Sequence, residues 1–108
     1  MGDSRALIIN SSGNITQLST DHKPDILQEK KRIIEKGGRV YAKRPSRGVG
    51  QGVARVWTTE EDGPGLAMSR SLGDYQAHSL GVTAKPQLVD YMIELTDEAI
   101  VIATDGVW

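Results

Sequence analysis

Near the end of the sequence stands the run Ile100-Val101-Ile102-Ala103-Thr104-Asp105-Gly106. Its first four residues are apolar and mostly β-branched, so we expect a strand that is buried on both faces. An aspartate just beyond such a strand, followed by a glycine that lets the backbone turn, is well placed to bind a hard cation or to meet a phosphate group. The alternative interpretation is that Asp-Gly forms an ordinary turn at this point.

A second aspartate lies at the other end of the chain, in Gly2-Asp3-Ser4-Arg5-Ala6. Between the two ends the chain carries several short motifs in a fixed order: Asp21-His22-Lys23-Pro24, Glu29 with Arg32-Ile33, Gly37-Gly38 with Val40, Gly65-Leu66-Ala67-Met68-Ser69-Arg70-Ser71-Leu72-Gly73-Asp74, Gly81-Val82 and Pro86. In this order and at this spacing they resemble the metal-dependent protein serine/threonine phosphatases of type 2C. The resemblance covers essentially the whole chain.

The resemblance implies an α+β chain that forms part of an α-β-β-α sandwich, in which two antiparallel sheets are flanked by helices. Residues 1–108 are expected to be the central part of a type 2C catalytic domain. The family's N-terminal motifs, which carry the bridging metal ligand and a phosphate-binding arginine, have no counterpart here, and neither does its later C-terminal aspartate motif. A flap-like loop region beside the active site is implied at about residues 41–65.

The same resemblance implies removal of phosphate from phosphoserine and phosphothreonine in proteins, by direct attack of a metal-bridged hydroxide on phosphorus without a covalent enzyme intermediate. Two core Mg²⁺ or Mn²⁺ ions are implied, and a third in some relatives. Asp105 matches a core-site aspartate, and Asp3 matches one that helps to hold the additional, weaker ion. For Asp3 the alternative is a turn aspartate that fixes the entry to a strand. Phosphorylated proteins are the expected partners, and the intact protein is expected to be a monomer.

Two functions of other kinds remain open. The chain could belong to a pseudo-phosphatase or adaptor that keeps the fold as a binding module, or it could be an inactive truncated fragment, and we expect the 108-residue chain alone to be inactive. Phosphatases that form an aspartyl-phosphate are excluded, because they need a second aspartate two residues after the first, where this chain has Val107.

Other polar residues are assigned structural roles. Arg5 is one, since the phosphate-binding arginine of the family lies outside this chain. Asp74 is expected to form an ion pair with Arg70, and the alternative is that Asp74 serves as a third metal ligand. His22 is expected to tie a loop to the start of a helix rather than to act as an acid. The glycines at 48, 50 and 52 lack the spacing and the following helix of a nucleotide-binding motif, which indicates a loop.

The composition excludes some partners. Thirteen Lys and Arg residues balance 14 Asp and Glu residues to a net charge of −1, so nothing indicates a nucleic-acid or membrane surface. The chain has no cysteine, and no part of it resembles a signal peptide or a membrane span, so we expect an intracellular protein, cytoplasmic or nuclear.

The local patterns predict two hairpins, one helix and one irregular region. Residues 5–9 and 15–18 flank a cluster of turn formers and predict a hairpin. Residues 25–36 predict a helix with a capping box at Asp25 and Gln28, an apolar stripe and a stop at Gly37-Gly38. Residues 88–95 and 99–104 predict a second hairpin. Residues 39–65 are expected to be loop-rich, with one short strand at residues 53–57 and a mobile loop at residues 43–52.

Overall fold

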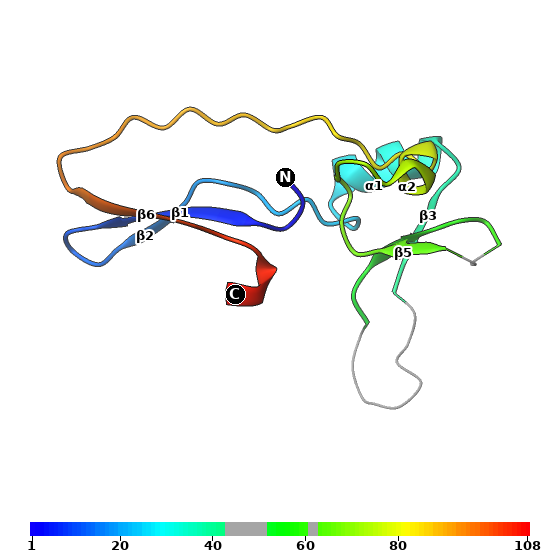
Figure 1. The fold of residues 1–108 in the computed structure, drawn as a ribbon, viewed down its shortest axis with the longest axis horizontal. Helices are drawn as coiled ribbons and strands as arrows, with labels where there is room; N and C mark the ends of the chain where they lie inside the picture. The colour runs from blue at the N-terminus through cyan, green and yellow to red at the C-terminus, as the bar shows by residue number, and fades with distance from the viewer. Residues whose placement is uncertain (43–51, 61–62) are drawn as a thin grey trace. The chain divides into compact units, whose positions relative to one another are not determined.

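The computed structural model describes residues 1–42, 52–60 and 63–108, and these residues form two compact units. The first unit comprises residues 1, 3–21 and 86–108, and the second comprises residue 2 and residues 22–85. Each unit contains a three-stranded antiparallel sheet, and the second unit also holds the helices α1 (Leu27–Glu35) and α2 (Tyr75–Ser79) (Figure 1). The predicted α+β class with two antiparallel sheets is therefore confirmed. Within the described residues, no helix has the length and apolar character needed to cross a bilayer.

In the first unit the central strand is β1 (Arg5–Asn10), which pairs with β2 (Ile15–Gln17) on one side and with β6 (Asp97–Ala103) on the other. The turn between β1 and β2 is closed by Asn10, whose Oδ1 accepts hydrogen bonds from the backbone N–H groups of Ser12 and Asn14 at 3.1 and 2.9 Å. Asparagine stabilises turns by this kind of local bond to the backbone. The first predicted hairpin is confirmed.

The predicted second hairpin is wrong. Residues 88–95 form no strand, whereas β6 pairs with β1 from Arg5↔Ala103 to Ile9↔Ala99. An apolar strand pattern specifies which face of a strand is buried, but it does not specify the strand with which it pairs. Here β6 pairs along its length with β1 and not with residues 88–95. The expectation that residues 100–103 are buried on both faces is also wrong, because β6 is an edge strand on which Ile100 and Ile102 remain 55% and 75% exposed.

The second unit packs its helices and sheet around a small apolar core. Its elements, in chain order, are α1 (Leu27–Glu35), β3 (Arg39–Tyr41), β4 (Arg55–Trp57), β5 (Pro64–Leu66) and α2 (Tyr75–Ser79). The sheet has the order β3-β4-β5. The core consists of Ile33, Val56, Ala77 and Val82. Of the apolar stripe predicted on the helix, Ile33 is therefore buried, but Leu27 and Ile34 are exposed.

The predicted helix is confirmed, with a different beginning. Ile26 is the N-cap residue of α1 and makes no side-chain capping bond, so the capping box expected from Asp25 and Gln28 is wrong. The end of the helix is as expected, because Gly37 takes a left-handed conformation with φ of 84°.

Residues 39–65 contain more sheet than the sequence predicts. The short strand expected at 53–57 is present as β4, and β3 and β5 pair with it through Val40↔Val56 and Val56↔Leu66. The rings of Tyr41 and Trp57 stack with their centroids 5.6 Å apart, which joins β3 to β4. The mobile loop predicted at 43–52 lies, except for residue 52, outside the described residues, as does part of the flap-like region at about 41–65.

Candidate functional site

The two aspartates predicted as metal ligands lie beyond the same end of two paired strands. β1 begins at Arg5 and β6 ends at Ala103, and these two residues are partners in the antiparallel ladder. Asp3 precedes β1 by two residues, and Asp105 follows β6 by two residues. Asp3 is 9% exposed, whereas Asp105 is exposed and begins the 3₁₀ helix η1 (Asp105–Val107). The pairing of β1 with β6 therefore brings both aspartates to one edge of the first sheet, namely the edge formed by the start of β1 and the end of β6.

Arg5 organises the polar contacts at this edge. Its Nε and Nη2 donate to Oδ1 and Oδ2 of Asp21 at 2.8 and 2.9 Å, which is a bidentate pair. The guanidinium carbon also lies 5.7 Å from the ring centroid of Trp108. The hydrogen bond to Asp21 raises the pKa of Arg5, and the nearby charges of Asp21 and Asp3 add to that rise. Arg5 thus has the structural role expected of it.

The donor chemistry of the two aspartates fits part of a site for a hard cation. Carboxylate oxygens are the ligands that Mg²⁺ and Mn²⁺ prefer, and such ions also keep several of their waters. Among the described residues, no group of three or more His, Cys, Asp or Glu side chains is placed to hold an ion. A complete two-ion site therefore needs donors in addition to Asp3 and Asp105.

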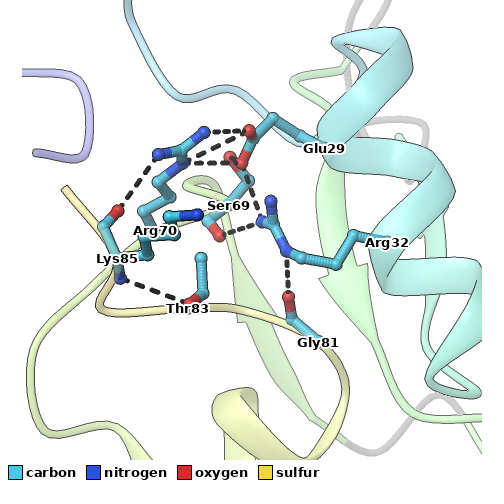
Figure 2. Close-up of polar contacts among 7 residues, drawn as sticks. All are labelled: Glu29, Arg32, Ser69, Arg70, Gly81, Thr83 and Lys85. Atoms are coloured by element: carbon cyan, nitrogen blue, oxygen red, sulfur yellow. Dashed lines mark hydrogen bonds and ion pairs between the residues drawn. The ribbon is translucent and has the colours of Figure 1, made fainter. Parts of the chain in front are cut away.

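A second polar cluster lies in the other unit, around the carboxylate of Glu29 on α1 (Figure 2). Glu29 is 4% exposed. Its Oε1 accepts a hydrogen bond from Arg70 Nη2 at 2.6 Å, and its Oε2 accepts from Arg32 Nη2 and from Ser69 Oγ, both at 2.7 Å. Arg32 also donates through Nε to the carbonyl oxygen of Gly81 at 2.7 Å. Glu29 and Arg32 together therefore join α1 to two segments that are remote from it in sequence, Glu29 to Ser69 and Arg70 and Arg32 to Gly81.

The charge of Glu29 is stabilised in this setting. Burial by itself would raise the pKa of Glu29, but the hydrogen bonds from Arg70, Arg32 and Ser69 outweigh burial and hold the pKa well below its usual value. The pKa of Arg70 is raised by its hydrogen bond to Glu29. Both groups are therefore charged throughout the neutral range.

This cluster corrects the prediction for Arg70. Its ion-pair partner is Glu29, 41 residues away in sequence, and not Asp74. Asp74 instead is the N-cap residue of α2, without a side-chain capping bond. The expectation for His22 is consistent with its contacts: it is buried, its backbone N–H donates to Gly2, and its carbonyl accepts from Ser69.

Comparison with known proteins identifies the family. The model of the protein phosphatase 2C family matches residues 1–108, the whole chain. The chain belongs to the protein phosphatase 2C family. It is 41% identical to the probable protein phosphatase 2C 48 of Oryza sativa subsp. japonica, covering 100% of this chain and 32% of the rice protein. It is 40% identical to the probable protein phosphatase 2C 34 of Arabidopsis thaliana, again over 100% of this chain and 30% of that protein.

Solved structures agree with this assignment. The serine-threonine phosphatase 2C of Toxoplasma gondii matches with a TM-score of 0.82 and 27% identity, over 100% of this chain and 36% of that one. A C. elegans sex determining protein matches with a TM-score of 0.76 and 26% identity, over 98% of this chain and 22% of that one. This type 2C chain therefore spans about a third of the length of the curated relatives it matches.

The structure explains why several motifs of this type 2C chain occur together. Glu29 and Arg32, the pair Ser69-Arg70, and Gly81 come from three separate motifs and meet in the Glu29 cluster. Sequence reasoning missed this arrangement. The available signal was a Glu and an Arg three residues apart on a predicted helix, because a buried carboxylate needs cationic partners from elsewhere in the chain.

Proposed function

We propose that this chain supplies Asp3 and Asp105 to the metal site of a phosphatase that removes phosphate from phosphoserine and phosphothreonine in proteins, with Mg²⁺ or Mn²⁺ as cofactor. Because the chain spans about a third of its curated relatives, it would act as part of a larger catalytic domain. Family membership supports the reaction class.

One observation carries the proposal for the site. The Arg5↔Ala103 pairing directs Asp3 and Asp105 to the same edge of the first sheet, although they are 102 positions apart in the sequence. When bound, the ions would activate a water and neutralise charge on the phosphoryl oxygens. Asp105 would hold a core ion through its carboxylate, and Asp3 would help to hold an additional ion. The half-exposed pair of Arg5 and Asp21 would fix the backbone between these ligands.

The test is an Asp105→Asn substitution in the complete catalytic domain. We expect kcat/KM on a phosphorylated peptide to fall about 100-fold or more, because an anionic ligand of a charge-stabilising ion is lost. Asp3→Asn should cost less. The exposed Asp90 provides a control, and Asp90→Asn should leave the activity unchanged. Equal activity of the wild type and Asp105→Asn at saturating Mn²⁺ would refute the assignment. A complete wild-type domain without metal-dependent activity would support the adaptor instead.

A further inference from the structure

We propose that Arg5 is a positioning residue for metal binding: it fixes the turn of residues 103–108 from both ends and so holds Asp105 in the orientation that binds a divalent cation. This inference rests on the proposed metal site and names the residue that orders it. It goes beyond a purely structural role for Arg5, because it predicts an effect on metal affinity.

The first end of the turn is attached through the backbone. Arg5 is the partner of Ala103 in the β1–β6 ladder, and Ala103 is the last residue of β6. Beyond it, Thr104 leads into η1, and a hydrogen bond from the Val107 N–H to the Thr104 carbonyl at 3.2 Å closes the 3₁₀ turn. Asp105 lies within this turn and is exposed.

The second end is attached through the side chain of the same arginine. The Arg5 guanidinium carbon is 5.7 Å from the ring centroid of Trp108, which is inside the range of about 6 Å for a cation–π contact. Trp108 is half-buried, and within the described parts of the chain its indole Nε1 has no hydrogen-bond partner. The guanidinium is therefore the polar group that orients this ring.

Asp21 makes it possible for the positively charged Arg5 to orient Trp108 close to a metal site. Its two carboxylate oxygens accept hydrogen bonds from Nε and Nη2 of Arg5, and this bidentate pairing fixes the plane of the guanidinium. The same pairing compensates the positive charge of Arg5, so that an incoming divalent ion meets less repulsion. The geometry thus combines a rigid support with little cost in charge.

An ordered Asp105 should bind an ion more tightly than a mobile one. Exposed turns without attachments lose conformational entropy when they bind, and an arrangement that is already ordered avoids that loss. Lysine cannot reproduce the fork to Asp21 or the flat stacking face, so Arg5→Lys removes the positioning while it keeps the charge.

The experiment is a calorimetric Mn²⁺ titration of the complete domain, carried out with five variants and a control. We expect Arg5→Lys and Trp108→Ala each to weaken Mn²⁺ binding about two- to five-fold, the size of one exposed cation–π contact. The double variant should be no weaker than either single variant, because both remove the same contact. Trp108→Phe keeps a ring face and should restore most of the affinity. Arg55→Lys makes the same change at an exposed arginine of the second unit, which donates to the Gly65 carbonyl, and should leave the affinity unchanged.

A fluorescence measurement reports the positioning independently of activity. In a background in which Trp57 and every tryptophan outside residues 1–108 are replaced by Phe, the emission of Trp108 should become more accessible to acrylamide when Arg5 is changed to Lys. Unchanged Mn²⁺ affinity in Arg5→Lys, or strictly additive effects of Arg5→Lys and Trp108→Ala, would overturn the proposal. Asp105→Asn in the same titration separates the two ideas: if it loses Mn²⁺ binding while Arg5→Lys does not, the positioning role alone is refuted. If Asp105→Asn binds Mn²⁺ as the wild type does, the proposed metal site fails as well.

Discussion

Replacing Glu29 by glutamine tests the buried cluster of the second unit. The substitution keeps the size and shape of the side chain but removes the charge that faces Arg32 and Arg70. The Glu29 side chain is 5% exposed, and the side chains of Arg70 and Arg32 are 16% and 29% exposed, so solvent compensates little for the loss. We expect a clear loss of stability without a change of fold.

The magnitude follows from the contacts. Hydrogen bonds to a charged partner contribute about 1.5–3 kcal/mol each, and Glu29 receives three that are 2.6–2.7 Å long. Glutamine keeps one acceptor oxygen, so part of this is retained, but its amide N–H groups then point toward arginine donors. Removing one member of a buried ion pair generally costs about 3–5 kcal/mol. We therefore expect Glu29→Gln to lower the free energy of unfolding by about 3–5 kcal/mol.

The assay is urea unfolding of the complete domain at pH 7, followed by far-ultraviolet circular dichroism. Glu35→Gln is the matched control, because Glu35 lies on the same helix and pairs with Lys31 at 3.9 Å, with side chains that are 62% and 74% exposed. Such an exposed pair contributes about 0.3–0.5 kcal/mol. A Glu29→Gln loss within about 0.5 kcal/mol of the control would show that the buried charge of Glu29 does not stabilise the fold.

The stabilisation that Glu29 provides depends on pH, and the direction of this dependence follows from its lowered pKa. The pKa of Glu29 is lowered in the folded state, so its stabilising effect is complete above the unfolded pKa and is lost as the pH falls toward the folded pKa. An unfolded glutamate titrates at about 4.3. The stability difference between wild type and Glu29→Gln should therefore be constant above about pH 5 and should narrow progressively below about pH 4. A difference that grows on acidification would contradict the assigned cause.

Two further predictions concern the chain as it stands and Gly81, a closely packed glycine with a positive φ. The isolated 108-residue chain should show no metal-dependent hydrolysis of a phosphorylated peptide and only weak Mn²⁺ binding by calorimetry, because Asp3 and Asp105 alone cannot anchor a pair of hydrated ions; turnover well above the blank would contradict this. Gly81→Ala should lower the free energy of unfolding by about 3 kcal/mol, since Gly81 has φ of 95° and a Cβ would stand 2.9 Å from the Arg32 carbonyl oxygen and from Ile33 Cα. Gly13→Ala, with φ of 78° and open space around it, should cost only about 1 kcal/mol by the same urea assay, and equal costs would refute the steric argument.

Local patterns predicted the elements of this chain better than their partners. The α1 helix and the β1–β2 hairpin depend on neighbouring residues, and both are present. The partner of β6 is β1, at the other end of the chain, and no periodicity near residue 100 indicates this. β5 is not predictable from the sequence for a related reason. Pro64-Gly65-Leu66 has the composition of a turn, and these residues form a strand because they pair with β4.

The same distinction between local patterns and long-range contacts holds for the candidate site. The family resemblance indicated Asp3 and Asp105 as candidate ligands, but their common edge depends on the register of the β1–β6 ladder, which the sequence does not show. Closeness in sequence favours Asp74 as the partner of Arg70, whereas the observed partner is Glu29, 41 residues away on α1. Long-range polar pairing follows from packing, and packing is what short patterns do not encode.

The Arg5–Asp21 pair and the Glu29 cluster should therefore have separable effects. The Arg5–Asp21 pair is half-exposed, with side chains 34% and 17% exposed, so it should contribute little to the stability of the fold. Its importance would lie in the turn that carries Asp105. The Glu29 cluster is buried and lies in the other unit, so its importance would lie in stability. Changes at Arg5 should then alter metal affinity at nearly constant stability, and changes at Glu29 should alter stability at nearly constant metal affinity. If both variants moved both quantities together, the metal-binding edge and the buried cluster would have to be treated as one coupled structure.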